Sequence, residues 1–324
     1  MANLKFRLLN ESDFPAYDEL IQKYGTIFAQ RNWLRIFEGE TNLLGLVNGS
    51  DDLVGAFPLR TEKRHGLRIA LKSPFTSCCG PYFTNELNSS KGALESRRFF
   101  LTEICAYLKQ LNLAICCISL DTRLEDCLPF RWCGYKVIPA YTYQVPLSQS
   151  QDEIIANFSS TRRRNIRSAL RDSIEIRPVY SFEAIEKLAK NTFDRQGKKL
   201  QTRVMRKILF EFASPQNSFA YAAFRGDEPI AGVFCIFDVR TAYYLIGGYD
   251  ASLAHQGAGA ACMQEAILKA KSLGLETFDF EGSVIPPIER YFRGFGGELT
   301  SYFTANRAWL PIEVLLKFRK RELF

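Results

Sequence analysis

The sequence predicts a mixed α/β fold built from two similar halves. In the second half, an apolar run at 243–249 indicates a buried strand, a glycine-rich turn leads into an amphipathic helix, and a second strand follows at 277–281. The first half repeats this order, with a strand at 67–71, a helix at 97–111 and a strand at 114–120. At 324 residues the chain is long enough to form two hydrophobic cores.

The two halves also share a spacing of glycines, which indicates an internal repeat. Gly49 and Gly55 stand six residues apart, as do Gly226 and Gly232, and the residues around both pairs match at one constant offset. The pattern extends to the late helix and strand of each half. We therefore expect two domains of the same type, in tandem.

The predicted domains are residues 1–147 and 148–324, packed into one unit. Just after this boundary, Ser150 and Glu153 have the spacing of a capping box, which predicts the start of a helix. Together these features define the expected fold class as α/β, with an α+β-like mixed sheet in each domain.

Composition limits the class of protein. Apolar residues make up 47% and charged residues 24% of the chain, as in soluble globular proteins. No run of about 18 uncharged apolar residues occurs, so we expect no membrane span. The nine cysteines lie mostly in apolar runs, as expected for buried side chains in a reducing, cytoplasmic compartment. With only two histidines and no paired-cysteine knuckle, we expect no metal site.

The turn at 256–261 is the strongest candidate for a binding site. Its sequence is Gln-Gly-Ala-Gly-Ala-Ala, and a helix begins within it. The free N–H groups at a helix start hold phosphate oxygens, and glycines allow the backbone to come close to a ligand. We expect a phosphate-bearing donor to bind at Gly248, Tyr249, Gln256, Gly257, Ala258, Gly259, Ala260 and Ala261.

This turn resembles the pyrophosphate loop of the GNAT acyltransferase superfamily, Gln/Arg-x-x-Gly-x-Gly/Ala, with Gln256, Gly259 and Ala261 in the motif positions. The segment at 292–296 resembles the Phe-Lys-x-x-Phe-Gly motif of the FemAB-like and BioF2-like (CelD-type) branch, with Arg in place of Lys and one residue fewer. Tandem GNAT domains are the architecture of that branch, so the resemblance covers nearly the whole chain. It implies acetyl-CoA or another acyl-CoA as co-substrate and an amine as acceptor.

Acyl transfer to an amine needs a base for the amine proton and an acid for the leaving thiolate. In GNAT proteins the donor lies between two splayed parallel strands, here those that end near residues 249 and 281. We expect Glu281, on one strand face with Asp279, to accept the amine proton. Tyr291 is the candidate acid, and Arg293 the candidate electrostatic support.

An arginine-rich stretch at 161–171 predicts a basic helix that opens the second half, with Ile166, Ala169 and Leu170 facing inward. It resembles the arginine-rich helix that opens the catalytic half of BioF2-like enzymes. A solvated basic face is the structural alternative. We expect a phosphorylated acceptor, such as a nucleotide-sugar or a cell-envelope precursor, to bind at Arg162, Arg163, Arg164 and Arg167.

The first half lacks such a turn. Its corresponding stretch, 73–82, contains Pro74 and Pro81, which have no N–H to donate, so we expect no second donor site there. We expect this half to supply a wall of the acceptor cleft instead.

Three functions remain open. The leading one is an acyl-CoA-dependent N-acyltransferase, acting on a small or nucleotide-linked amine. The second is a FemAB-like transferase that uses aminoacyl-tRNA and acts on a peptidoglycan precursor, suggested by the tandem domains and the net charge of +7. The third is a non-catalytic nucleic-acid-binding protein, which we rank last because no nucleic-acid fold motif is present and we expect no DNA partner.

Overall fold

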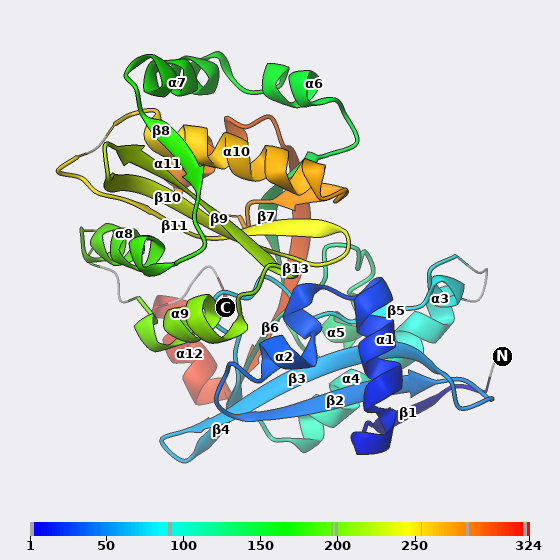
Figure 1. The fold of residues 1–324 in the computed structure, drawn as a ribbon. Coiled ribbons are helices and arrows are strands. Elements are labelled where there is room, and N and C mark those ends of the chain that lie inside the picture. The colour runs from blue at the N-terminus through cyan, green and yellow to red at the C-terminus, as the bar shows by residue number, and fades with distance from the viewer. Residues whose placement is uncertain are drawn as a thin grey trace. The chain divides into compact units, whose positions relative to one another are not determined.

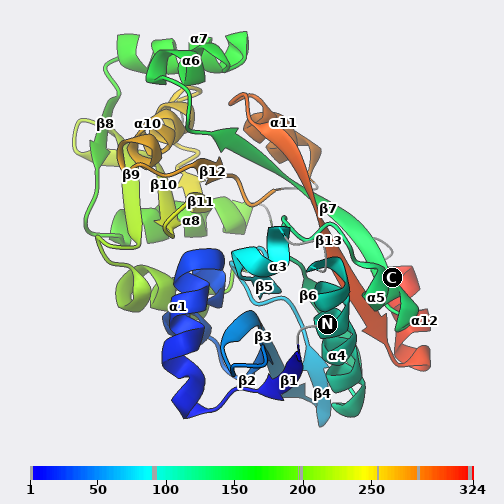
Figure 2. The same cartoon turned by 90° about the vertical axis from the view of Figure 1, so that its right-hand side faces the viewer.

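The computed structural model describes residues 3–89, 93–195, 197, 200–253, 255–282, 285–319 and 323–324. The chain forms two compact units (Figures 1 and 2). The first unit contains Met1–Ala140 and Ser301–Phe324, and the second contains Tyr141–Thr300. The predicted mixed α/β class is confirmed in both units. In the described part of the chain, no helix has the length and apolar character needed to cross a membrane.

The first unit is a sheet with helices on both faces. The strand order is β1-β2-β3-β4-β6-β13, and β5 pairs with β3. Its strands are β1 (Lys5–Leu8), β2 (Glu40–Val47), β3 (Leu53–Arg64), β4 (Leu67–Ala70), β5 (Tyr82–Phe83), β6 (Ile115–Ser119), the start of β7 (Lys136–Pro146) and the end of β13 (Glu298–Ala308). Its α-helices are α1 (Phe14–Tyr24), α2 (Arg31–Leu34), α3 (Asn85–Ser89), α4 (Ala93–Gln110), α5 (Leu128–Trp132) and α12 (Leu310–Arg319).

The second unit has a similar plan. Its strand order is β7-β12-β11-β10-β9-β8. The strands are β8 (Glu175–Pro178), β9 (Ser218–Arg225), β10 (Glu228–Phe237), β11 (Thr241–Tyr249) and β12 (Thr277–Asp279), with the end of β7. The α-helices are α6 (Gln151–Ala156), α7 (Ser160–Arg171), α8 (Glu183–Arg195), α9 (Thr202–Lys207), α10 (Ala258–Ser272) and α11 (Pro286–Arg293). In each unit, an antiparallel run of strands is followed by a long helix and one parallel strand.

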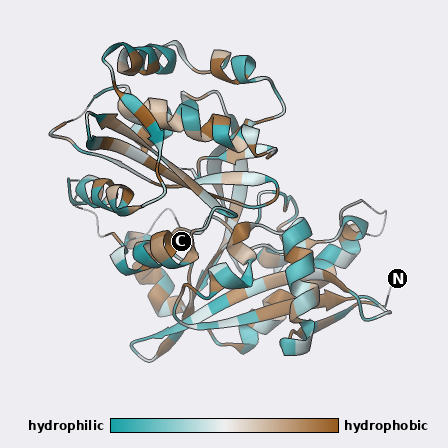
Figure 3. Ribbon diagram, viewed as in Figure 1, coloured by the Kyte–Doolittle hydropathy of each residue, from teal (hydrophilic) through white to brown (hydrophobic). Residues whose placement is uncertain are grey.

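The residues of β10 contact α10 and α8 alternately, so that the sheet of the second unit lies between these two helices. Ala231, Val233 and Cys235 share a core with α10, whereas a Cβ at Gly232 would meet Ile185 of α8. Successive strand residues point to opposite faces, so one strand serves both helices. Figure 1 shows α10 and α8 on opposite faces of this sheet, and Figure 3 shows the hydrophobic strands between them.

Several predicted elements differ from the structure in detail. The apolar residues at 28–37 have the spacing of one helix, but the structure divides this stretch into a short 3-10 turn, Ile27–Ala29, and α2. The strand expected at 277–281 ends at Asp279. Leu170, expected to face inward, is 61% exposed, while the capping box at Ser150 is present as predicted.

The domain division at 147/148 follows the repeat in the sequence and stays a prediction. By contacts, the chain leaves the first unit within β7 and returns to it within β13. The end of β13 pairs with β6, and the end of β7 pairs with β12. Because the unit limits fall within β7 and β13, the division by contacts differs from the division by the sequence repeat.

Candidate active site

The parallel strands β11 and β12 pair over only three residues. The last of these pairs joins Tyr243 to Asp279. β12 ends there, whereas β11 continues to Tyr249 with β10 as its partner on the other side. Beyond Tyr243, β11 therefore carries backbone groups that β12 does not use. The resemblance to GNAT proteins implies a donor site at an opening of this kind, between two parallel strands.

The part of β11 beyond Tyr243 contains a bulge, and α8 packs closely against one of its faces. The register with β10 shifts between Phe234 and Cys235, so that Leu245 has no opposite residue, which is a β-bulge. A Cβ at Gly248 would lie 2.3 Å from the carbonyl oxygen of Leu188, so α8 approaches this strand too closely for a larger residue. The bulge and α8 together fix the course of β11 up to Tyr249.

The start of α10 offers backbone donors. Ala258 N–H donates to His255 O at 3.2 Å, and Ala261 N–H donates to Gly257 O at 2.8 Å. Within the described residues, the N–H groups of Gly259 and Ala260 have no such partner, as expected for the first turn of a helix. The side chains of Ala258, Ala260 and Ala261 are buried in the core, so this turn can hold a ligand only through its backbone. Gln256 is exposed.

The two glycines of this turn differ in their surroundings. A Cβ at Gly257 would lie 1.9 Å from the carbonyl oxygen of Asn165, because α7 packs against the start of α10. A Cβ at Gly259 would meet only the Tyr291 hydroxyl, at 3.6 Å. Gly257 therefore serves helix packing, while Gly259 leaves open space in front of Tyr291.

A histidine that the sequence analysis passed over fixes the turn. Gly257 N–H donates to His255 Nδ1 at 3.1 Å, and His255 Nε2 lies 3.0 Å from Asp172 Oδ2. With Nδ1 as acceptor, the neutral ring carries its proton on Nε2 and donates it to Asp172. Hydrogen bonds from Arg171 first, and from His255, lower the pKa of Asp172 to about 2. A lone histidine outside any motif gives no signal of this role.

Tyr291, the predicted acid, packs against an aromatic and a basic side chain. It lies on α11, partly buried against the core, with its ring 5.2 Å from that of Phe295. Burial, with the nearby Tyr244 hydroxyl as a second cause, raises the pKa of Tyr291 well above its ordinary value. The side chain therefore holds its proton at neutral pH and is suited to act as an acid.

Arg162 covers the other side of Tyr291. Its guanidinium carbon lies 4.2 Å from the centre of the Tyr291 ring and 5.5 Å from that of Phe295. Its Nε donates to Tyr291 O at 3.4 Å. Burial lowers the pKa of Arg162 from its very high ordinary value, which leaves it a cation. No carboxylate pairs with it among the described residues.

The carboxylates at the end of β12 have separate environments. Asp279 is buried and accepts hydrogen bonds from Thr142 Oγ1 at 2.5 Å and Gln144 Nε2 at 2.8 Å. It also accepts from Glu281 N–H at 2.7 Å. Glu281 follows the strand with φ of 61°, a left-handed conformation that is unusual for a side chain of this size. The two therefore do not alternate on one strand, and Asp279 orients the backbone of Glu281.

Arg293 does not lie with Tyr291. Its Nε is 3.2 Å from Glu289 Oε1 and its side chain is 59% exposed. Glu289 also accepts a hydrogen bond from the Tyr143 hydroxyl at 2.7 Å. These contacts account for Arg293 as part of an ion pair on the surface of α11.

The four arginines of α7 that were predicted to bind the acceptor do not form one cluster. Arg162 stacks on Tyr291, and Arg163 donates to the carbonyl oxygens of Ala156 and Phe158 at the preceding turn. Arg164 and Arg167 are exposed. The structure thus separates two arginines with structural contacts from two that point to solvent.

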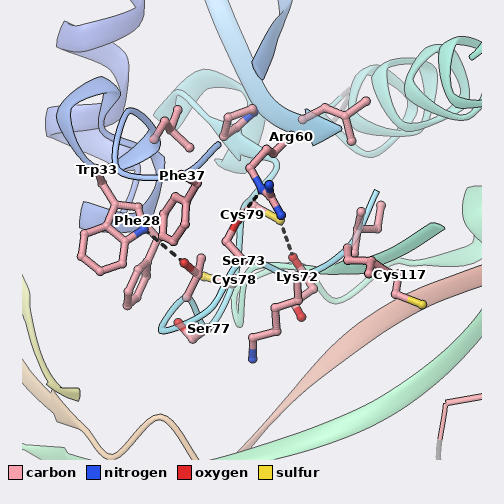
Figure 4. Close-up of a pocket in the computed structure, with 17 residues that line it drawn as sticks. Phe28, Trp33, Phe37, Arg60, Lys72, Ser73, Ser77, Cys78, Cys79 and Cys117 are labelled. Atoms are coloured by element: carbon pink, nitrogen blue, oxygen red, sulfur yellow. Dashed lines mark hydrogen bonds between the residues drawn. The ribbon is translucent and has the colours of Figure 1, made fainter. Parts of the chain in front are cut away.

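The first unit contains a counterpart of the strand opening, but its own chain fills it. β4 pairs in parallel with β6 and ends at Ala70, and Cys79 N–H donates to Ser119 O at 3.1 Å beside it. Figure 4 shows the remaining cavity, where Trp33 donates to Thr76 and Arg60 donates to Ser73. Its volume is about 30 Å³, far below that of a nucleotide site.

Comparison with known proteins defines the class. Residues 160–293 match the family model described as "Acetyltransferase (GNAT) domain". This match identifies a GNAT-type acetyltransferase domain at residues 160–293, where the sequence resemblance predicted one. No curated protein sequence matches it.

Three solved structures share the fold over nearly the whole chain. The structure of FemX is 12% identical, with a TM-score of 0.72, and the alignment covers 97% of this chain and 100% of FemX. A tandem GNAT protein from the clavulanic acid biosynthesis pathway is 11% identical (TM-score 0.56; 94% and 98% covered). The C-terminal domain of a putative lysylphosphatidylglycerol synthetase from Agrobacterium fabrum is 9% identical (TM-score 0.60; 95% and 96% covered). At these identities the likeness concerns the fold.

Proposed function

We propose that this protein is an acyl-CoA-dependent N-acyltransferase whose donor site lies in the second unit. The observation that carries the proposal is the position of Gly259. It opens the first turn of α10 toward the Tyr291 hydroxyl, in the same unit as the gap between β11 and β12. The helix start can bind the phosphates of the donor, and Tyr291 can donate a proton to its leaving thiolate.

The residues present fit an acyl-CoA. The free N–H groups of Gly259 and Ala260, at the positive end of the α10 dipole, suit a pyrophosphate. Among the described residues, no strand pairs with the edge of β11 from Tyr244 to Gly248, and this edge suits the amide groups of a pantetheine arm, which bind as an added strand does. At Tyr249 the backbone instead bonds to Thr192 Oγ1. The acyl group is proposed to be acetyl.

The chemistry is an aminolysis. The amine nitrogen attacks the thioester carbonyl, the C–N bond forms, and the C–S bond breaks. Glu281 is the proposed acceptor of the amine proton, directly or through water, and Tyr291 the proposed donor to the departing thiolate. We keep Arg293 only as a distant electrostatic contribution, because Glu289 pairs with it.

One observation favours a second candidate. FemX matches this fold over its full length, and FemAB-like enzymes are expected to use aminoacyl-tRNA. The net charge of +7 suits either donor. The two candidates differ in the donor and share the strand opening.

The two candidate functions are distinguished by testing which acyl donor the protein uses. Purified protein is titrated with CoA and incubated with labelled acetyl-CoA or labelled aminoacyl-tRNA, each with a panel of amines. We expect tight CoA binding and label transfer from acetyl-CoA only. Transfer from aminoacyl-tRNA without CoA binding would replace this proposal with the second candidate.

The proposed acceptor is a phosphorylated amine, such as a nucleotide-sugar or cell-envelope precursor, in the cytoplasm. Nine unbridged cysteines agree with a reducing compartment. Within the described residues, no group of three His, Cys, Asp or Glu side chains is arranged to hold a metal ion, and the proposed chemistry uses none. Arg164 and Arg167 are the proposed phosphate contacts, since they are exposed and an arginine fork binds phosphate oxygens in pairs.

Arg164→Ala with Arg167→Ala tests the acceptor contact. We expect KM for a phosphorylated acceptor to rise about tenfold, with CoA affinity unchanged, because each lost charged contact costs on the order of 1 kcal/mol. Arg225→Ala, at an exposed arginine of β9, is the matched control. Equal KM values in the double variant and the wild type would remove these arginines from the site.

A further inference from the structure

The last helix of the first unit, α12, exposes an apolar face. Leu310 is 75%, Val314 47%, Leu315 52% and Phe318 86% exposed. At 3.6 residues per turn these four side chains fall on one side of the helix. We call them the α12 apolar face. Figure 3 shows the helix with its apolar residues coloured brown.

The opposite side of α12 holds it to the first unit. Trp309 N–H donates to Ala114 O at 3.0 Å, and Glu313 pairs with Lys136 Nζ at 3.2 Å. Ile312 and Leu316 are partly buried on this side. The helix is therefore attached to the first unit by its other side, and the exposed apolar residues face away from that contact.

Basic residues border the apolar face. On a helical projection, Lys317 lies at one edge and Arg319 at the other, and both are exposed. The acidic residue of the described helix, Glu313, faces the unit and is paired with Lys136 and Lys317. The sequence continues with Lys320, Arg321 and Glu322, whose side chains together add one net positive charge.

A hollow with more basic residues lies beside the start of the helix. It has a volume of about 630 Å³ and is lined in part by Leu310, Lys109 and Arg307. Glu313 also lines it, with its charge paired to Lys136 and Lys317. Arg307 donates to Cys133 O at 3.2 Å, and both Lys109 and Arg307 are exposed. The space next to Leu310 is thus suited to an anionic group.

We propose that α12 docks this protein onto an anionic membrane surface, lying in the plane of the lipid headgroups with the apolar face inserted. Helices of this type have a bulky apolar side bordered by Lys and Arg, whose stems lie along the hydrocarbon while their charges reach the phosphates. Anionic headgroups complement the border, and the acyl-chain boundary covers the apolar residues. A second copy of this chain is the less suitable occupant, because pairing two α12 helices would bring like charges together.

Vesicle sedimentation tests the proposal independently of any transferase activity. The whole chain is mixed with vesicles of phosphatidylcholine alone or with phosphatidylglycerol added. We expect at least about tenfold stronger binding to the anionic vesicles, weakening above about 0.1 M salt as the charges are screened.

Two variants locate the contact. Leu315→Ser with Phe318→Ser removes apolar area, and Lys317→Glu with Arg319→Glu reverses the border; each is expected to lower anionic-vesicle binding about tenfold or more. Tyr180→Ser is the matched control, since Tyr180 is 88% exposed in the second unit and is expected to bind as the wild type does. These exposed sites leave the core intact, which a circular dichroism melt verifies.

Three outcomes would overturn the proposal. The wild type shows no preference for anionic vesicles, the α12 variants bind as tightly as the wild type, or the wild type is a dimer in sedimentation equilibrium that the Leu315/Phe318 variant dissociates. The last result would assign the α12 apolar face to a second copy of this chain.

Discussion

At the scale of single residues, the candidate site depends on three neighbouring side chains, Tyr291, Tyr244 and Arg162. Burial is the main cause that raises the pKa of Tyr291, and the nearby Tyr244 hydroxyl raises it further. Arg162, stacked 4.2 Å above the ring, acts in the opposite direction. The net result is a hydroxyl that keeps its proton, with a cation nearby for the negative charge that develops on a departing sulfur.

Tyr291→Phe tests this assignment. We expect kcat to fall about a hundredfold while the KM for the acyl donor stays the same, because a lost general acid affects the transition state alone. Since the pKa of Tyr291 is raised, deprotonation of this acid is expected only above the ordinary tyrosine value of about 10, so kcat falls through this group only at still higher pH.

Steady-state kinetics over a range of pH measures both effects. Tyr180→Phe, an exposed tyrosine, serves as the control. A Tyr291→Phe enzyme with full kcat would remove this residue from the chemistry and leave positioning of the substrates as the main source of rate.

At the scale of elements, the packing of α7 on α10 explains why the glycine turn has the sequence it has. Gly257 allows the Asn165 carbonyl to approach, and the His255–Asp172 contact joins the same two elements. The second glycine, Gly259, is not needed for this packing. One glycine of the turn is thus structural and the other is available to a ligand.

A pair of alanine variants separates these roles. Gly257→Ala is expected to destabilise the protein by about 1–3 kcal/mol, because the new methyl group collides with backbone that cannot move freely. Gly259→Ala is expected to keep or raise the melting temperature, since its Cβ makes an ordinary contact and alanine favours helix by about 0.5–1 kcal/mol. Thermal melts of both variants measure this, and equal stability would contradict the packing described for Gly257.

The elements were largely predictable from local sequence, whereas their functional details were not. The apolar runs, the capping box at Ser150 and the glycine turn are local patterns, and each appears where expected. Leu170 was placed wrongly because periodicity alone does not say which side of a short helix meets α10. The ion pair of Arg293 with Glu289, the stacking of Arg162 and the left-handed Glu281 depend on tertiary contacts or strain, which no local pattern encodes.

At the scale of the whole molecule, the two units have a similar order of strands and helices. They differ at the ends of their parallel strand pairs, β11–β12 and β4–β6. In the second unit β11 runs past β12, and beyond Tyr243 no second strand pairs with it in the part of the chain that the structure describes. In the first unit Cys79 binds to the end of β6, and the cavity that remains holds little more than water. The repeat seen in the glycine spacing predicted the shared plan. The expectation that only the second unit binds donor rests on Pro74 and Pro81 and stays a prediction.

Calorimetric titration with CoA tests the central claim most directly, using the wild type, Gly259→Leu, and Gly259→Ala as the folded control. We predict one site per chain in the wild type, and loss of at least about tenfold in affinity in Gly259→Leu, whose side chain fills the space before Tyr291. Two sites per chain, or unchanged affinity in a folded Gly259→Leu protein, would contradict the account of a single donor site at the start of α10.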